Sequence, residues 1–213
     1  MMNSYKSDFP NQVHQLNISI SKNHYLLKNN EIKYQQKKFD INWKNYSKTG
    51  KRHLVNYLIR DHFSNCFYAE VHPIDKMPEL KDFLFNAWKK KADFEFRGIP
   101  KYLFLSQKIL NENSNIENFA KNVDIFDIEL VKNGFGSAIR SIRDWENCIR
   151  YYLMFQNYNT IEDFGINNEY FCREYNLRTN SKKSESNLEK WAKNKPRVIL
   201  ISKKEEFNKY FEK

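Results

Sequence analysis

The stretch of residues 39–71 constrains the fold of this chain more than any other part of its sequence. It contains three segments typical of strands, separated by short polar turns: residues 39–43, 53–60 and 66–71. Gly50 lies in the first turn, where it can adopt a positive φ without steric cost. We therefore predict a three-stranded antiparallel meander with Asp40 near the middle of its first strand. A rigid sheet that presents a carboxylate is a suitable platform for metal-dependent phosphoryl transfer.

Composition limits the class of protein. The chain has 213 residues, enough for one domain with a sizeable core, and its aromatic content of 16% argues against disorder. A formal net charge of +10 is compatible with an anionic partner such as nucleic acid, and equally with a lysine-rich, solvated surface. The cysteines and histidines show no metal-ligand spacing. Because there is no apolar leader and no run long enough to cross a bilayer, we expect a soluble, cytoplasmic protein without a membrane role.

Helices and strands alternate after the meander. Residues 77–91 carry apolar side chains at helical spacing, and a second amphipathic helix follows Ser137, which can cap it. Between these helices we predict a strand at residues 101–106, a helix at residues 112–121 and a strand at residues 125–131. This order predicts an α/β fold in which a mixed sheet, the meander plus two parallel strands, is flanked by helices.

The chain beyond residue 155 is predicted to be mainly helical. Ser186 and Glu189 form a capping box for a short helix, residues 197–202 predict one more strand, and residues 203–213 predict a terminal helix. We divide the chain into a polar, basic N-terminal extension, a core and a mainly helical C-terminal extension: residues 1–36, 37–155 and 156–213.

Four short segments, in this order, are similar to segments of a known family: Phe39-Asp40-Ile41, Leu58 to Ser64, Gly98 to Leu103 and Gly136 to Arg140. Together they make residues 37–153 resemble the RNase-H-like catalytic core of DDE transposases and retroviral-type integrases. The resemblance implies three carboxylates that hold two divalent ions, Mg²⁺ or Mn²⁺. These ions activate a water or a 3′-hydroxyl for in-line attack on a phosphodiester.

Only the first of the three implied acidic positions is acidic in this chain. Asp40 matches that position, whereas Ser106 and Ile139 occupy the second and third. A serine hydroxyl is a poor Mg²⁺ ligand and isoleucine is none, so we predict a catalytically degenerate core with no cofactor. The alternative is an active nuclease or integrase that uses Asp40, Glu146 and a third carboxylate such as Asp61.

Basic residues surround the predicted site. Lys101 and Lys108 flank the central strand, while Arg140, Arg143 and Arg150 occupy the polar side of the second helix. The resemblance implies that such groups contact DNA phosphates without reading sequence. We predict an inactive transposase- or integrase-like protein of a mobile element that binds DNA or other recombination proteins and could form homo-oligomers. A third hypothesis is a protein-interaction module without a nucleic-acid role.

Overall fold

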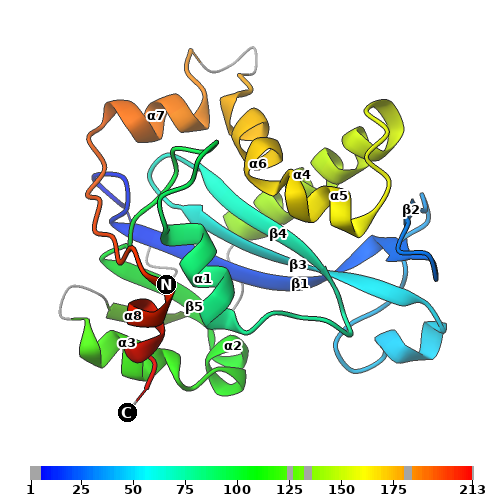
Figure 1. Ribbon diagram of the computed structural model, residues 1–213, viewed down its shortest axis with the longest axis horizontal. Helices are drawn as coiled ribbons and strands as arrows, with labels where there is room; N and C mark the ends of the chain where they lie inside the picture. The colour runs from blue at the N-terminus through cyan, green and yellow to red at the C-terminus, as the bar shows by residue number, and fades with distance from the viewer. Residues whose placement is uncertain (1–5, 124–126, 132–135, 180–183, 213) are drawn as a thin grey trace.

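The computed structural model describes residues 6–123, 127–131, 136–179 and 184–212. Within these residues, six strands form one sheet in the order β4-β3-β1-β5-β6, with β2 paired to one end of β1 (Figure 1). The strands are β1 (Val13–Leu26), β2 (Ile32–Tyr34), β3 (Arg52–Asp61), β4 (Phe67–Pro73), β5 (Tyr102–Ser106) and β6 (Asp127–Val131). β1, β3 and β4 are antiparallel neighbours, and β5 and β6 run parallel to β1. The predicted mixed sheet, a meander plus two parallel strands, is confirmed.

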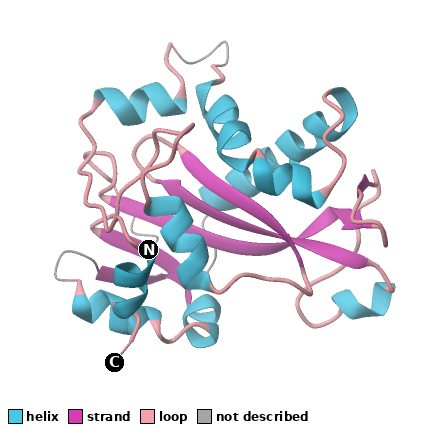
Figure 2. Cartoon of the chain, in the orientation of Figure 1, coloured by secondary structure: helices cyan, strands magenta, loops and turns pink. Residues whose placement is uncertain are grey.

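Helices surround this sheet (Figure 2). They are the 3₁₀-helix η1 (Tyr46–Thr49) and the α-helices α1 (Leu80–Trp88), α2 (Gln107–Glu112), α3 (Ile116–Asn122), α4 (Gly136–Phe155), α5 (Ile161–Ile166), α6 (Asn168–Leu177), α7 (Asn187–Lys193) and α8 (Lys204–Lys209). The predicted capping box is present, since Ser186 accepts a hydrogen bond from the Glu189 backbone and the Glu189 side chain accepts one in return. Among the described residues, no helix has both the length and the apolar character needed to cross a membrane.

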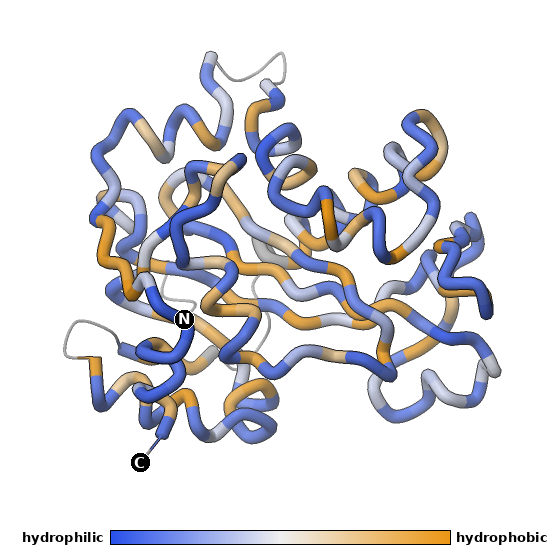
Figure 3. Tube along the Cα trace, viewed as in Figure 1, coloured by the Kyte–Doolittle hydropathy of each residue, from blue (hydrophilic) through white to orange (hydrophobic). Residues whose placement is uncertain are grey.

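The two long helices of the core lie on opposite faces of the sheet. Phe83 of α1 packs against Tyr68 of β4, while Trp145 of α4 packs edge-on against the preceding residue, Phe67. Because successive side chains of a strand point to opposite faces, α1 and α4 must cover different faces. Figure 1 shows this arrangement, with α1 in front of the strands and α4 behind them. Apolar residues follow the central strands, and hydrophilic residues follow the outer loops (Figure 3).

The central strand of the sheet is β1, and our prediction of the first strand at residues 39–43 was wrong. β1 lies within the segment that we assigned to a polar N-terminal extension. Its apolar residues Leu16, Ile18 and Ile20 share one face, and Leu16 and Ile20 are buried. The residues that alternate with them are polar and resemble a solvent-facing set: Gln15, Asn17, Ser19 and Ser21. Helix α4 packs on this polar side, where Ser21 hydrogen-bonds Glu146 of α4. The polar residues of β1 therefore led us to assign this segment to an extension, although it is a strand with protein packed on both faces.

Residues 39–43 form a loop whose apolar side chains pack inward, but whose backbone forms no strand pairing. Ile41 is 3% exposed, and the Phe39 ring meets the His53 ring edge-on at 4.8 Å. Asn42 and Asn45 hydrogen-bond locally, with the Asn42 backbone N–H donating to Asn45 Oδ1 at 2.6 Å. Asparagine side chains that bond nearby backbone groups compete with strand pairing. Alternating burial alone was therefore insufficient to identify a strand.

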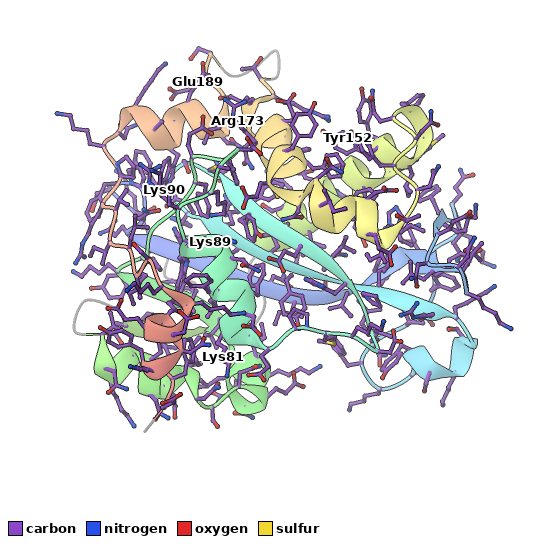
Figure 4. The ribbon with its side chains drawn as sticks, viewed as in Figure 1. Lys81, Lys89, Lys90, Tyr152, Arg173 and Glu189 are labelled. Atoms are coloured by element: carbon purple, nitrogen blue, oxygen red, sulfur yellow. The ribbon has the colours of Figure 1, made fainter. Side chains whose placement is uncertain are left out.

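The C-terminal segment packs onto the same core. The Tyr152 ring of α4 stacks on Phe171 of α6 at 3.9 Å between ring centroids (Figure 4). The predicted strand at residues 197–202 is not formed. Among the residues that the structure describes, the Ile99 N–H donates to the Ile199 carbonyl and attaches that segment to the loop before β5.

Candidate nucleic-acid interface

An exposed row of arginines runs along the outer side of α4. Arg140, Arg143 and Arg150 are all exposed, and Asn147 and Met154 complete the row at spacings of three and four residues. Residues at this spacing lie on one side of a helix. Within the described part of the chain, none of these arginines has a carboxylate within 4.0 Å. We call Arg140, Arg143 and Arg150 the arginine row.

Glu146 lies on the inner side of the same helix, facing the sheet. Its carboxylate accepts hydrogen bonds from Asn56 of β3, at 3.3 Å, and from Ser21 of β1. Burial raises the pKa of the Glu146 carboxyl, and these hydrogen bonds oppose the rise. The contacts join α4 to the two central strands. They also direct the negative charge of Glu146 away from the arginine row.

Asp144 is the other acidic residue of α4, and it is half-buried. Burial raises the pKa of its carboxyl, while the charges of Arg143, Arg140 and Arg60 and a hydrogen bond from Tyr175 lower it. One carboxylate thus sits close to the arginine row. With three arginines against one partly buried acid, the outer side of α4 remains positively charged.

The structure does not place the two predicted lysines on the arginine row. Lys101 precedes β5 and Lys108 lies in α2 after it, so they are at opposite ends of the strand. Lys101 lies over the Tyr102 ring at 5.0 Å, and Lys108 lies over the Trp43 ring at 4.5 Å. Lys108 also approaches Glu112 to 3.6 Å, which partly neutralises it. Of the five predicted basic residues, the three arginines form the arginine row, and the two lysines lie apart from it and from each other.

The acidic candidates are dispersed. Asp40 is exposed in the loop between β2 and η1, so its predicted position on the first strand was wrong. Asp61, at the end of β3, is fully buried and accepts from the Ser64 hydroxyl at 2.6 Å, the Ser64 N–H at 2.7 Å and the Asn11 N–H at 2.8 Å. Burial raises the pKa of Asp61, and these hydrogen bonds work against the rise. Its role is to hold the turn between β3 and β4.

Asn17 is the residue of β1 that lies beside Ser106. Gln15 of β1 pairs with Phe104 of β5, so Asn17, two residues further along, is level with Ser106. Both residues line one cavity of about 280 Å³. The signal that could have identified Asn17 was the alternation of Leu16, Ile18 and Ile20 around it. No residue of β1 or β5 is acidic.

The donor set at these positions does not fit a pair of divalent metal ions. The Ser106 hydroxyl caps α2 by accepting a hydrogen bond from the Ile109 N–H at 3.3 Å. Ile139 is 59% exposed and has no donor atom in its side chain. Asn17 supplies a neutral amide, whereas Mg²⁺ sites are built on carboxylates. Across the described ranges, no three His, Cys, Asp or Glu side chains are arranged to hold a metal ion.

Comparisons with known proteins agree with this fold. No family model matches the sequence, and no curated protein matches it. A structure of the HTLV-2 integrase catalytic core domain in complex with magnesium, in a trimeric form, matches 87% of this chain and 99% of its own, with 13% identity and a TM-score of 0.50. A chain of the simian T-cell lymphotropic virus intasome, solved by cryo-EM with a PP2A regulatory subunit, shows 12% identity and a TM-score of 0.49. That match covers 93% of this chain and 61% of the other.

The protein has an RNase-H-like fold of the kind found in retroviral integrase catalytic cores. The predicted resemblance is thereby confirmed at the level of the fold.

Proposed function

We propose that this protein binds the phosphate backbone of DNA through the arginine row of α4 and does not cut or join strands by a two-metal mechanism. The single observation that supports the binding most strongly is the arginine row itself, exposed and without a salt bridge in the described structure. The integrase-like fold supports DNA as the ligand. We further propose that the protein belongs to a mobile element and acts together with other recombination proteins of that element. Homo-oligomers are part of the same proposal.

The spacing of the arginine row suits a polyanion. Arg140 and Arg150 are ten residues apart, which corresponds to about 15 Å along a helix. A duplex carries one negative charge for about each 1.7 Å of its axis when both strands are counted, so a duplex of this length carries roughly nine phosphates. Guanidinium groups at this spacing can therefore contact phosphates without base recognition. Binding of this kind is independent of sequence and weakens steeply with salt.

The proposal that catalysis is lost rests on residue chemistry. Asn17, Ser106 and Ile139 supply no carboxylate, so these positions lack the charged oxygen ligands on which Mg²⁺ sites are built. Cleavage or strand transfer in Mg²⁺ or Mn²⁺ that is abolished by Asp40→Asn or Glu146→Gln would replace this proposal with the active enzyme. Complete absence of DNA binding would instead favour the protein-interaction module.

Salt dependence tests the arginine row directly. Fluorescence anisotropy with a labelled duplex, measured from 50 to 200 mM salt, should give a linear plot of log affinity against log salt. Replacing Arg140, Arg143 and Arg150 together by Gln should reduce the slope by up to about 2.7, since each phosphate contact contributes about 0.9.

A matched variant controls for net charge. Lys81, Lys89 and Lys90 belong to α1 or directly follow it, on the opposite face of the sheet (Figure 4). Changing these three lysines to Gln removes the same charge and should leave the slope nearly unchanged. Equal losses in the two triple variants would show that binding depends on diffuse charge, and the arginine row would lose its assigned role.

A further inference from the structure

Exposed aromatic side chains stand where the arginine row ends. Tyr151 is 38% exposed, Met154 55% and Phe155 67%, all in the last turn and a half of α4. The Tyr151 and Phe155 rings are one turn apart, with centroids 5.5 Å apart and planes inclined at 40°. We call Tyr151 and Phe155 the aromatic end of α4. Together with Met154, these rings form a contiguous exposed apolar cluster, and it is contiguous clusters, not single exposed residues, that mark interaction sites.

Two guanidinium groups flank the aromatic end. Arg178, which follows α6, lies over the Tyr151 ring at 5.0 Å and over the Tyr175 ring at 5.4 Å. Arg150 lies over the Tyr34 ring of β2 at 4.6 Å. Cation–π contacts position both guanidinium groups, and the Arg150 Nε–H also donates to the Met154 sulfur at 3.4 Å. The terminal N–H groups of a guanidinium can still bond a phosphate in such a position. The apolar rings are therefore bordered by positive charge.

We propose that the aromatic end of α4 stacks on unpaired bases, so that the preferred ligand is DNA with a single-stranded segment. This inference rests on the proposed backbone binding by the arginine row and specifies which DNA it selects. Bases inside a duplex are already stacked and cannot reach a ring on the protein surface. An unpaired base offers a free face for stacking, and the strand that carries it supplies phosphates to Arg150 and Arg178.

The geometry places the two kinds of contact in sequence along one helix. Arg140 and Phe155 are fifteen residues apart, about 22 Å along the axis. Duplex phosphates would lie along the arginine row, and the strand would then pass onto the aromatic end where pairing stops. A purely apolar protein partner would not require the flanking arginines. Charge complementarity therefore favours nucleic acid as the occupant.

The test compares a blunt duplex, the same duplex with a single-stranded overhang, and a single strand. Stacking of one base on a ring contributes about 5- to 150-fold in affinity, so the overhang duplex should bind tighter than the blunt duplex by a factor in that range. Phe155→Ala removes one of the two rings and should reduce the preference by about fivefold or more, while leaving the affinity and salt slope for the blunt duplex unchanged. Phe155→Leu, which is apolar but has no ring, should reduce it by a similar factor. Ile166→Ala, at a residue of α5 that is 83% exposed, is the matched surface control.

The outcomes separate the two proposals. Salt-dependent binding of the blunt duplex without an overhang preference would overturn this inference and leave the arginine row intact. No salt-dependent binding of any probe would overturn both. Sedimentation analysis adds a third arm, because a change in oligomeric state caused by Phe155→Ala, with the overhang preference unchanged, would show that the aromatic end binds a second copy of the chain.

Discussion

Asn176 of α6 hydrogen-bonds the outer edge of β4, which α6 buries, and its removal should destabilise the protein strongly. Its side chain is fully buried and bonds both backbone groups of Phe67. Nδ2 donates to the Phe67 carbonyl at 2.7 Å, and Oδ1 accepts from the Phe67 N–H at 3.0 Å. Cys172, one turn earlier, bonds the N–H and carbonyl of Ala69 in the same manner through its sulfur. Side chains of α6 thus take the place of a further strand beside β4.

The cost of losing these bonds follows from the two groups left behind. Asn176→Ala would leave the N–H and the carbonyl of Phe67 buried without a hydrogen-bond partner from α6. Each such group lowers the free energy of unfolding by about 1–3 kcal/mol. We therefore expect a loss of about 2 to 6 kcal/mol, a large part of the roughly 5–15 kcal/mol that stabilises a typical domain. Urea denaturation followed by tryptophan fluorescence measures the change, since Trp145 packs against Phe67.

Asn194→Ala is the matched control for this prediction. Asn194 is exposed and makes one local hydrogen bond, from Nδ2 to the Lys190 carbonyl at 2.7 Å, so its replacement should change stability by about 0.5 kcal/mol or less. A loss below about 1 kcal/mol for Asn176→Ala would refute the reasoning, because it would mean that water or a shift of α6 satisfies the edge of β4 equally well.

Two further changes test the packing and the electrostatics of the fold. Gly98 has a φ of +100°, and an added Cβ would lie 2.8 Å from Asn11 Nδ2, so Gly98→Ala should cost more than about 1 kcal/mol in urea denaturation. Gly165→Ala, in α5 with nothing within 4 Å of the new Cβ, should be neutral or stabilise by up to about 1 kcal/mol, and the reverse ranking would contradict this account. Because burial raises the pKa of Glu146, its contribution to stability is full below the pKa of an unfolded glutamate and is lost as pH rises through the folded pKa. Glu146→Gln should therefore be more stable than wild type at pH 7, with the difference shrinking or reversing toward pH 4, and a variant less stable at pH 7 would oppose this sign.

Much of the fold could be predicted from local patterns. Helix α1 and strand β5 formed close to their predicted bounds, because apolar periodicity and turn residues report burial of one face. The Ser186 capping box was correct for a similar reason, since its partners are three residues apart. Interactions between residues that are close in sequence can be predicted, because both partners are visible in one short segment.

The central strand was missed because its polar side is buried by a distant helix. Ser21 of β1 and Asn56 of β3 contact Glu146, which is far away in sequence. In the sequence, such residues look like a solvated strand face or a loop. The same long-range packing turns Glu146 inward, and the pattern of α4 alone did not reveal this. Asp40 illustrates the opposite error, because its neighbours Phe39 and Ile41 pack inward from a loop that has no strand partner.

The sequence by itself determined the class of sheet, the alternation of its later strands with helices and the row of arginines on α4. These features depend on spacing along the chain, which a helix or strand converts directly into a common face. Only the tertiary structure decided which strand lies at the centre, that Asn17 rather than Asp40 is level with Ser106, and that Arg178 joins Tyr151 at the end of α4. The physical reason is that these relations join segments far apart in sequence, and packing of the whole chain sets them.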